Sequence, residues 1–466
     1  MSELAVDICV LGAGPAGYVA AIRAAQLGAG VALIEKGELG GTCLNRGCIP
    51  TKTLLKTAAV YEEIAHAGHF GIRLCKDAAS VDSAAVLERK DTVVRFLRSG
   101  IEQLMKKNGV TVCRGVGRIQ SSRCVQVETA KGGLTVRCDK LILAAGSAPL
   151  VPPIPGADAD GVLTSDDALQ TAEVPGSIVI VGGGVIGLEF ASYYSVLGSV
   201  VTVVEMKDRI LPGEDTEISQ ALTRLMKKRG VKFKLGVKVL RIDREKGGLN
   251  TQIEEKGACA SLSSDRVLIA VGRKLCGLTP DAVNLGLKEN RGAIVVDEHM
   301  RTSVGGVYAA GDATGGRLLA HLAFAQGRIA AENAAGLNTT SAASLVVPAC
   351  VYTEPEAASV GLNEETAKQA GFDCMVGRFD FRANGRSLSL GNRDGFVKVI
   401  ADKSSGVLLG ACIFGPDASE MISELTLAVT LKANITVLAD MIHPHPSLAE
   451  AVSEACADAL GRAIHK

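Results

Sequence analysis

The chain contains the same sequence pattern twice, 170 residues apart. Ile8–Gly17 (ICVLGAGPAG) aligns with Ile178–Gly187 (IVIVGGGVIG), and the match continues without a gap to Glu35 and Glu205. Each copy reads as an apolar strand, a G-x-G-x-x-G turn, a helix, a glycine stop, a second strand and an acid at its end. The repeat predicts two strand–turn–helix units of one fold.

The glycines of such a turn have distinct roles. The first makes the tight turn, the second lets a pyrophosphate approach the backbone, and the third lets the helix pack on the strand. The helix N-terminus offers N–H groups to phosphates, and the acid accepts hydrogen bonds from ribose hydroxyls. The two sets are Gly12, Gly14, Gly17 and Glu35, and Gly182, Gly184, Gly187 and Glu205. One such turn is weak evidence, but two complete copies predict one site for FAD and one for a nicotinamide nucleotide.

The second acid indicates which nicotinamide nucleotide binds. A carboxylate at Glu205 would repel a 2′-phosphate, and sites for NADP usually carry arginine there instead. Met206 and Lys207 follow, and Arg209 is the only guanidinium nearby. The pattern therefore favours NAD.

Length and charge limit the classes of protein. A chain of 466 residues is too long for one core, so several domains are expected. Its 50 basic and 50 acidic residues give no net charge, which disfavours nucleic-acid and membrane partners. The apolar run Ile8–Ile22 is too short to span a bilayer and lacks the preceding positive charge of a signal peptide. The 13 cysteines, mostly isolated on apolar segments, predict a cytoplasmic protein, and no zinc-like spacing predicts a metal site.

Cys43 and Cys48 stand out because they follow the first repeat closely. Residues five apart in a regular helix have Cα atoms about 8–9 Å apart, too far for a disulfide. Gly47 and Pro50 would allow the distorted turn that a bridge needs. From spacing alone, two inert buried thiols remain an equally open interpretation.

The segment around these cysteines resembles a known family. Gly40–Lys52 (GGTCLNRGCIPTK) is similar to the active-site segment of the flavin disulfide reductases, the class I pyridine nucleotide-disulfide oxidoreductases. The resemblance continues in order along essentially the whole chain. Its further segments are Leu141–Pro149, Val267–Leu275, Gly311–Ala313, Leu319–His321 and His443–Glu450.

The resemblance implies a role for each matching residue. Cys48 would form the thiolate that touches the flavin, and Cys43 would exchange with the substrate disulfide. Lys52 and Glu189 would form a pair beside the flavin. His445, oriented by Glu450, would act as the base that produces the attacking thiolate. The implied FAD residues are Gly12, Gly14, Gly17, Glu35, Lys36, Gly41, Thr42, Lys52, Gly115, Gly146, Asp312 and Ala320, and the implied NAD residues are Gly182, Gly184, Gly187, Glu205, Val239, Gly272 and Arg273.

Within the family the resemblance is closest to the branch that oxidises dihydrolipoamide. Leu44, Ile49 and Thr51 favour that branch, and the vicinal C-terminal cysteines of other branches are absent. The resemblance then implies a homodimer whose partner is the lipoyl-carrying acyltransferase of a 2-oxo-acid dehydrogenase complex or the lipoyl carrier of glycine cleavage. Arg46 departs from the valine of many relatives, and its positive charge would favour the thiolates.

Other functions stay open. A reductase of another disulfide, dependent on NADH, would use the same residues. A nicotinamide transhydrogenase would lack one of the two cysteines. A flavoprotein that acts only as a redox-responsive binding module would need neither the cysteine pair nor the pair His445 and Glu450.

The predicted fold class is α/β, with two Rossmann-like domains for FAD and NAD(P) and a C-terminal α+β dimerisation domain. The predicted regions are residues 1–149 (FAD), 150–275 (NAD), 276–346 (central, completing the FAD site) and 347–466 (interface). In the last region we predict strands at Phe396–Ala401 and Val407–Phe414, and helices at Ser419–Lys432 and Ser447–Leu460.

Overall fold

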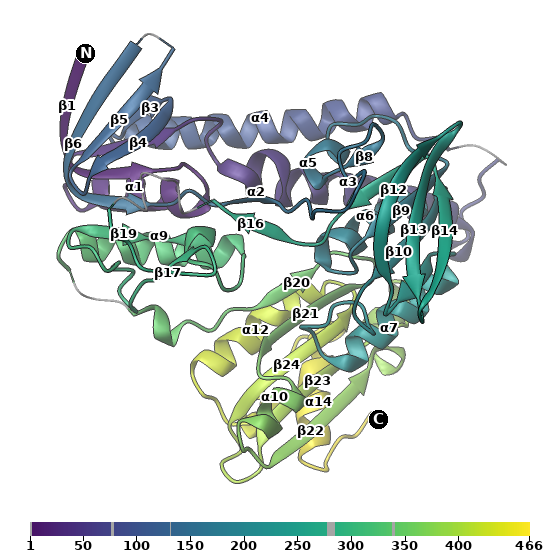
Figure 1. Ribbon diagram of the computed structural model, residues 1–466. Coiled ribbons are helices and arrows are strands. Elements are labelled where there is room, and N and C mark those ends of the chain that lie inside the picture. Colours follow the sequence, from purple (N-terminus) through teal and green to yellow (C-terminus); the bar gives the residue numbers. More distant parts are fainter. Residues whose placement is uncertain (1, 76–78, 131, 277–284, 338–340) are drawn as a thin grey trace. The chain divides into compact units, whose positions relative to one another are not determined.

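The computed structural model describes residues 2–75, 79–130, 132–276, 285–337 and 341–466 (Figure 1). The chain forms two compact units, and each is described by itself. The first comprises Met1–Thr53, Leu87–Leu150 and Arg273–Leu345, and the second comprises Leu54–Val86, Val151–Gly272 and Val346–Lys466. The borders of the four predicted regions stay predictions.

The first unit is built on a seven-stranded sheet of order β3-β2-β1-β6-β5-β4, in which β19 also pairs with β6. Its strands are β1 (Ser2–Leu11), β2 (Val31–Glu35), β3 (Thr111–Arg114), β4 (Val116–Ser121), β5 (Cys124–Thr129), β6 (Gly132–Leu143) and β19 (Val307–Ala309). β1 pairs in parallel with both β2 and β6. Helices α1 (Pro15–Gln26) and α9 (Ala320–Ala334) pack against each other beside this sheet (Figure 1).

The inner half of β1 is apolar on both sides because both faces of the sheet are covered. Ile8 and Val10 share a core with the alanines of α1 and α9. Cys9, between them in the chain, belongs to a different core together with Ile34 and Leu141. A strand buried on both faces needs a continuous apolar run rather than alternation, as the sequence has here.

The second copy of the repeat forms a parallel sheet in the second unit. Its order is β11-β10-β9-β15-β8, and β12, β13 and β14 form a separate antiparallel sheet. The elements are β8 (Val162–Leu163), β9 (Ser177–Val181), α6 (Val185–Val196), β10 (Val200–Glu205), α7 (Thr216–Lys228), β11 (Lys232–Leu235), β12 (Lys238–Glu245), β13 (Gly248–Glu255), β14 (Ala258–Ser264) and β15 (Arg266–Ile269). β9 pairs with β10 and β15 as β1 pairs with β2 and β6, so the repeat in sequence is a repeat in topology.

The C-terminal part of the second unit is an antiparallel sheet of order β20-β21-β24-β23-β22. α12 packs against β21 and β24, and α14 packs against β22 and β23. The elements are β20 (Ala349–Val351), β21 (Glu356–Gly361), α10 (Glu364–Gln369), β22 (Cys374–Asp380), α11 (Gly385–Ser389), β23 (Phe396–Asp402), β24 (Leu408–Gly415), α12 (Ala418–Thr430), α13 (Ile435–Asp440) and α14 (Glu450–Ala459).

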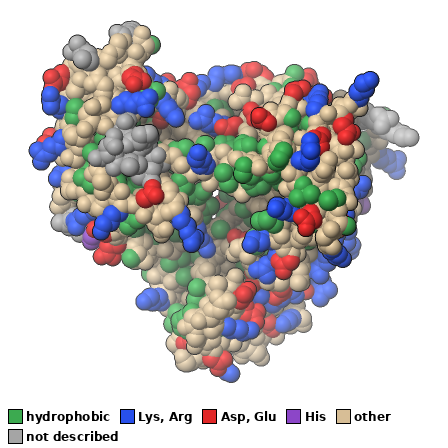
Figure 2. All heavy atoms as spheres, in the orientation of Figure 1, with side chains coloured by type: hydrophobic (Ala, Val, Ile, Leu, Met, Phe, Trp, Pro, Cys, Tyr) green, Lys and Arg blue, Asp and Glu red, His purple; other side chains and the backbone are tan. Residues whose placement is uncertain are grey.

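The remaining elements complete the two units. They are α2 (Gly41–Arg46), α3 (Cys48–Ala65), α4 (Ser83–Lys107), β7 (Ser147–Pro149), α5 (Ser165–Ala168), β16 (Arg273–Leu275), β17 (Glu289–Asn290), β18 (Ala293–Ile294) and the 3₁₀ helices Ala67–Phe70, Gly311–Thr314, Ala342–Ser344 and Phe381–Ala383. Among the described residues, every helix is too short or too polar to cross a bilayer. On the face drawn in Figure 2, basic and acidic side chains are interspersed.

The predicted fold class is confirmed by the parallel strands that each repeat contributes to its sheet and by the C-terminal α+β layer. Three of the predicted C-terminal elements agree with the structure to within two residues. The helix predicted from Ser447 begins only at Glu450, after a bend and a turn, and the Glu450 carboxylate accepts the Ser447 N–H at 2.7 Å.

Candidate active site

The first glycine-rich turn leaves space at its second glycine. Gly12 adopts a φ of +99°, and a Cβ there would lie 2.3 Å from the Ala144 carbonyl oxygen. A Cβ on Gly17 would lie 1.7 Å from the Gly12 carbonyl oxygen, so the third glycine lets α1 approach the strand. A Cβ on Gly14 would meet only the Gly41 Cα, at 3.9 Å, and no side chain caps α1. The first turn of α1 can therefore offer N–H groups to a phosphate.

The second glycine-rich turn is also crowded at its first and third glycines and open at its second. A Cβ on Gly182, whose φ is +113°, would lie 2.4 Å from the Ala270 carbonyl oxygen, and one on Gly187 would lie 2.1 Å from the Gly182 oxygen. A Cβ on Gly184 would meet nothing within 4 Å, and no side chain caps α6. In both copies the first and third glycines serve the fold, whereas the second leaves room for a ligand.

The acid at the end of each second strand is held by the turn it faces. The Glu35 carboxylate accepts the N–H of Ala13 at 2.6 Å and that of Gly37 at 2.7 Å. The Glu205 carboxylate likewise accepts the N–H of Gly183 at 2.7 Å and that of Lys207 at 2.7 Å. Each carboxylate oxygen keeps a further lone pair, so both acids can still accept a ribose hydroxyl.

The cysteine pair lies at a break between two helices. Cys43 is on α2, and Cys48 is the first residue of α3. Gly47 separates the helices with φ −149° and ψ −115°, and a Cβ there would lie 3.0 Å from the Thr42 carbonyl oxygen and 3.3 Å from the Cys43 Cα. Gly47 therefore supplies the predicted distortion. Both cysteines are half-buried thiols, and they are hydrogen-bonded to each other.

Asn45 holds the segment that carries Cys43. Its Nδ2 atom donates to the carbonyl oxygens of Leu39 and Gly41, both at 2.9 Å. Its Oδ1 atom is buried without a hydrogen-bond partner among the described residues, so it can accept a bond from a bound cofactor. The prediction from sequence did not include Asn45, although it lies between the two cysteines.

The surroundings of Cys43 keep a proton on its thiol. The hydrogen bond with Cys48 raises the pKa of Cys43 well above its usual range, and burial raises it further. The positive charge of Lys52 acts in the opposite direction. When the reduced pair carries one negative charge, that charge is therefore favoured on Cys48.

A polar chain joins three segments of the first unit near the predicted FAD residue Asp312. The Ser147 hydroxyl donates to the Asp312 carboxylate. Arg273 donates from Nε to the Ser147 hydroxyl at 2.7 Å and from Nη2 to its carbonyl oxygen at 2.8 Å. Ser147 was not predicted, and its position directly after Gly146 was the available signal. A role of Arg273 in binding NAD stays a prediction.

The C-terminal motif brings His445 and Glu450 together. His445 Nδ1 lies 2.8 Å from Glu450 Oε1, while 80% of the histidine side chain is exposed. Burial acts to raise the pKa of Glu450, but hydrogen bonds from the Ser447 N–H and from His445 outweigh it, and the pKa is lowered. The ionised carboxylate fixes the ring through Nδ1 and leaves Nε2 available to a substrate.

The structure places the other predicted site residues on α6, on β12, and at turns or the ends of elements. Glu189 is buried in α6 and accepts the Tyr352 N–H at 3.2 Å. Val239 is buried in β12. The remainder stand at turns or element ends, namely Lys36, Gly41, Thr42, Gly115, Gly146, Gly272 and Ala320. The pairing of Lys52 with Glu189 stays a prediction, because the two residues belong to different units.

Comparison with protein families identifies the chain. Residues 6–327 match the model described as pyridine nucleotide-disulphide oxidoreductase, and residues 347–456 match the dimerisation domain of the same family. The chain belongs to the pyridine nucleotide-disulphide oxidoreductases. The family prediction from the cysteine segment is thus confirmed.

Individual members of the family match over nearly the whole chain. A protein named dihydrolipoyl dehydrogenase from Bacillus subtilis is 43% identical over 98% of this chain and 99% of its own length. The structure of LpdA from Mycobacterium tuberculosis is 28% identical, with a TM-score of 0.89 and coverage of 98% and 99%. The HOCl-induced flavoprotein disulfide reductase RclA from Escherichia coli, as a Cu(II) complex, is 31% identical with a TM-score of 0.87 and the same coverage.

This oxidoreductase uses FAD and NAD, as its family and relatives do. The open second glycines, the uncapped helices and the two held acids fit two dinucleotides, which supports the cofactors predicted from the repeat. The described residues contain no group of three or more His, Cys, Asp or Glu side chains that could hold a metal ion.

Proposed function

We propose that this oxidoreductase is a dihydrolipoyl dehydrogenase, which oxidises protein-bound dihydrolipoamide to lipoamide and reduces NAD to NADH. The observation that carries the proposal is the thiol pair Cys43 and Cys48, in a chain whose full-length relatives of 39–43% identity are named dihydrolipoyl dehydrogenase. The same activity explains why the chain repeats one nucleotide motif.

The protein residues would handle the thiols and protons. In the oxidised enzyme Cys43 and Cys48 form a disulfide. A substrate thiolate attacks Cys43, which gives a mixed disulfide and leaves Cys48 as the thiolate; the second substrate thiolate then attacks its own bound sulfur and releases lipoamide. The high pKa of Cys43 keeps the proton of the reduced pair on that sulfur.

His445 would remove protons from the substrate thiols, and Glu450 would hold its ring through Nδ1. Bound FAD would supply the two-electron chemistry that connects the dithiol with NAD. The FAD would be held by the first glycine turn and Glu35, together with the segments of Asn45 and Asp312. The NAD would be held by the second glycine turn and Glu205.

The match to the dimerisation domain supports a homodimer. We propose that its substrate arrives on the acyltransferase of a 2-oxo-acid dehydrogenase complex or on the lipoyl carrier of glycine cleavage. We also propose that the enzyme is cytoplasmic, because most of its 13 cysteines are isolated on apolar segments, as in proteins of a reducing compartment. Fractionation of cells that produce the protein tests the location.

The test of function compares disulfide substrates. Purified holoenzyme is assayed with dihydrolipoamide, glutathione and thioredoxin, each with NAD and with NADP. Dihydrolipoamide with NAD should give the highest kcat/KM. Faster turnover of another disulfide with NADH would overturn the proposal in favour of a different disulfide reductase, the class to which RclA belongs.

A further inference from the structure

Arg209 lies on a short loop that is anchored on the second glycine turn. The Glu205 carboxylate accepts the Gly183 N–H at 2.7 Å, at the start of the loop. The Leu211 N–H donates to the Gly183 carbonyl oxygen at 3.0 Å, at its end. The loop 206–210 therefore begins and ends at the glycine turn that is proposed to bind NAD, and Arg209 lies beside that turn.

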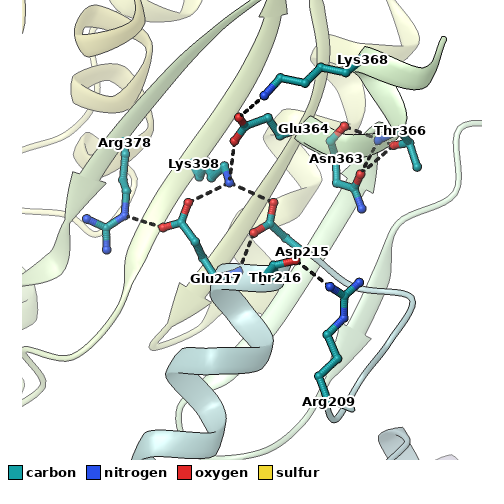
Figure 3. Close-up of polar contacts among 10 residues, drawn as sticks. All are labelled: Arg209, Asp215, Thr216, Glu217, Asn363, Glu364, Thr366, Lys368, Arg378 and Lys398. Atoms are coloured by element: carbon teal, nitrogen blue, oxygen red, sulfur yellow. Dashed lines mark hydrogen bonds and ion pairs between the residues drawn. The ribbon is translucent and has the colours of Figure 1, made fainter. Parts of the chain in front are cut away.

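The guanidinium of Arg209 is directed toward the start of α7 (Figure 3). Its Nη1 atom donates to the Thr216 hydroxyl at 2.8 Å, and Nη2 donates to the Pro212 carbonyl oxygen at 3.1 Å. A guanidinium is planar and presents its donors in a fixed fork, so two bonds define the orientation of the whole group.

A network of charges around the buried Lys398 fixes the position of Thr216. Asp215 caps α7, because its Oδ1 atom accepts the Glu217 N–H at 2.9 Å, and its Oδ2 atom accepts from Lys398 Nζ at 3.0 Å. Lys398 is buried, and it also contacts Glu217 at 2.8 Å and Glu364 at 3.3 Å (Figure 3). These contacts hold the first turn of α7 and therefore the hydroxyl that faces Arg209.

We infer that Arg209 is a specificity-determining residue for the nicotinamide nucleotide. Its hydrogen bond to Thr216 holds the guanidinium away from the nucleotide. A 2′-phosphate needs a cationic partner, for which arginine is the usual residue. While Arg209 is bonded to Thr216 and Pro212, Glu205 meets the ribose alone and its charge repels a phosphate. Two effects thus select for NAD: Glu205 repels the 2′-phosphate of NADP, and Arg209 is not available to bind it. The inference rests on the proposed nucleotide site at Glu205.

The test is a stepwise series of variants. Glu205→Ala should weaken the use of NADH without improving the use of NADPH, because Arg209 stays bonded to Thr216. Adding Thr216→Val removes the acceptor but keeps the shape of the side chain, so Arg209 can turn to the 2′-phosphate. From the single to the double variant, kcat/KM for NADPH-driven dye reduction should rise about tenfold, mainly through a lower KM.

Two control variants separate this effect from a general loosening of the fold. Adding Arg209→Gln to the double variant should abolish the gain. Thr223→Val, on the same helix but bonded to the Ser219 carbonyl oxygen at 2.7 Å, should give no gain when combined with Glu205→Ala. Thermal melting of each holoenzyme confirms that the variants are folded.

The inference is overturned if Glu205→Ala alone uses NADPH as well as the double variant does, or if the gain survives Arg209→Gln. Dye reduction does not involve the dithiol substrate. An enzyme that reduces dye with NADH but fails to oxidise dihydrolipoamide would therefore contradict the proposed function and leave the inference about Arg209 intact.

Discussion

The two cysteines at the break between α2 and α3 differ in their surroundings. Cys43 is hydrogen-bonded to Cys48 and its pKa is raised, so the proton of the reduced pair stays with Cys43. Lys52, four residues after Cys48 on α3, acts in the opposite direction on the pKa of Cys43, but the hydrogen bond and burial outweigh it. Under the proposed function, Cys43 would exchange with substrate and Cys48 would hold the negative charge of the reduced pair.

Replacing either cysteine should separate the two halves of the reaction. Cys43→Ser and Cys48→Ser should each reduce dihydrolipoamide oxidation to background, because serine cannot form the disulfide. Electron transfer from NADH to a dye should continue at near the normal rate, since both nucleotide turns are untouched. Near-normal dihydrolipoamide oxidation by Cys48→Ser would show that the disulfide mechanism is wrong.

Glu354 gives a second prediction, for stability against pH. Burial raises its pKa to about 7, and the positive charge of Arg229 opposes the shift only in part. Arg229 is shared, since it also donates to the Glu354 carbonyl oxygen and pairs with Glu62 at 3.0 Å. The other acids that raise the pKa are Glu62, Glu356 and Asp417.

A pKa that is raised on folding contributes stability at pH below the unfolded value, and this stability is lost as pH rises through about 7. Glu354→Gln should therefore match the unmodified protein near pH 4.5 and exceed it in free energy of unfolding by about 1–3 kcal/mol at pH 8. Urea unfolding at both pH values measures this. Glu254→Gln, the same substitution at an exposed position on β13, is the control.

At the scale of elements, Lys398 on β23 connects the interface-domain sheet with the start of α7. Burial acts to lower the pKa of Lys398, but hydrogen bonds with Glu217 and Asp215 outweigh it, and the pKa is raised. Arg378 on β22 contributes a second cation, 3.2 Å from Glu217 (Figure 3). Its guanidinium also lies 4.5 Å from the centroid of the Phe396 ring. The ammonium is therefore the partner that makes a buried Asp215 tolerable.

Lys398→Met should destabilise the protein by about 3–5 kcal/mol, because it leaves the buried Asp215 carboxylate without its cation. Adding Asp215→Asn should recover part of the loss, since asparagine can still cap α7 and carries no charge. Denaturant unfolding of the single and double variants provides the measurement. If the second change destabilised the protein further, the ion pair would not be the main role of Lys398.

At the scale of the whole molecule, the chain carries a domain whose family counterpart makes dimers. His445 lies in that domain, about 400 residues after Cys48 in sequence, and its side chain is largely exposed. In a two-fold dimer each partner contributes the same surface. We expect each active site to combine Cys48 of one chain with His445 of its partner.

Subunit exchange tests this arrangement. Cys48→Ser and His445→Gln chains, each nearly inactive alone, are mixed in equal amounts under conditions that exchange subunits. About half of the dimers should be mixed, each with one intact site of two, so about a quarter of normal activity should return. Sites built within single chains would give no recovery above the parent proteins.

The residue pattern was sufficient for the fold class and the cofactors, because each depends on local features. Two glycine turns in register, each closed by Glu35 or Glu205, can hardly serve another fold, and the structure gives both acids the same contacts. The start of α14 was predicted three residues too early, because the residue pattern does not locate the end of a helix to within a turn.

Contacts between residues that are distant in sequence could be identified only from the three-dimensional structure. Ser147 joins Asp312 to Arg273, and Lys398 reaches Asp215 across 183 residues of sequence. Such partners leave no periodicity or spacing in the sequence, because their energies arise only when burial removes water from the charges. Arg209 was visible as a nearby cation, but its two hydrogen bonds at the start of α7 depend on how the loop folds back on the glycine turn.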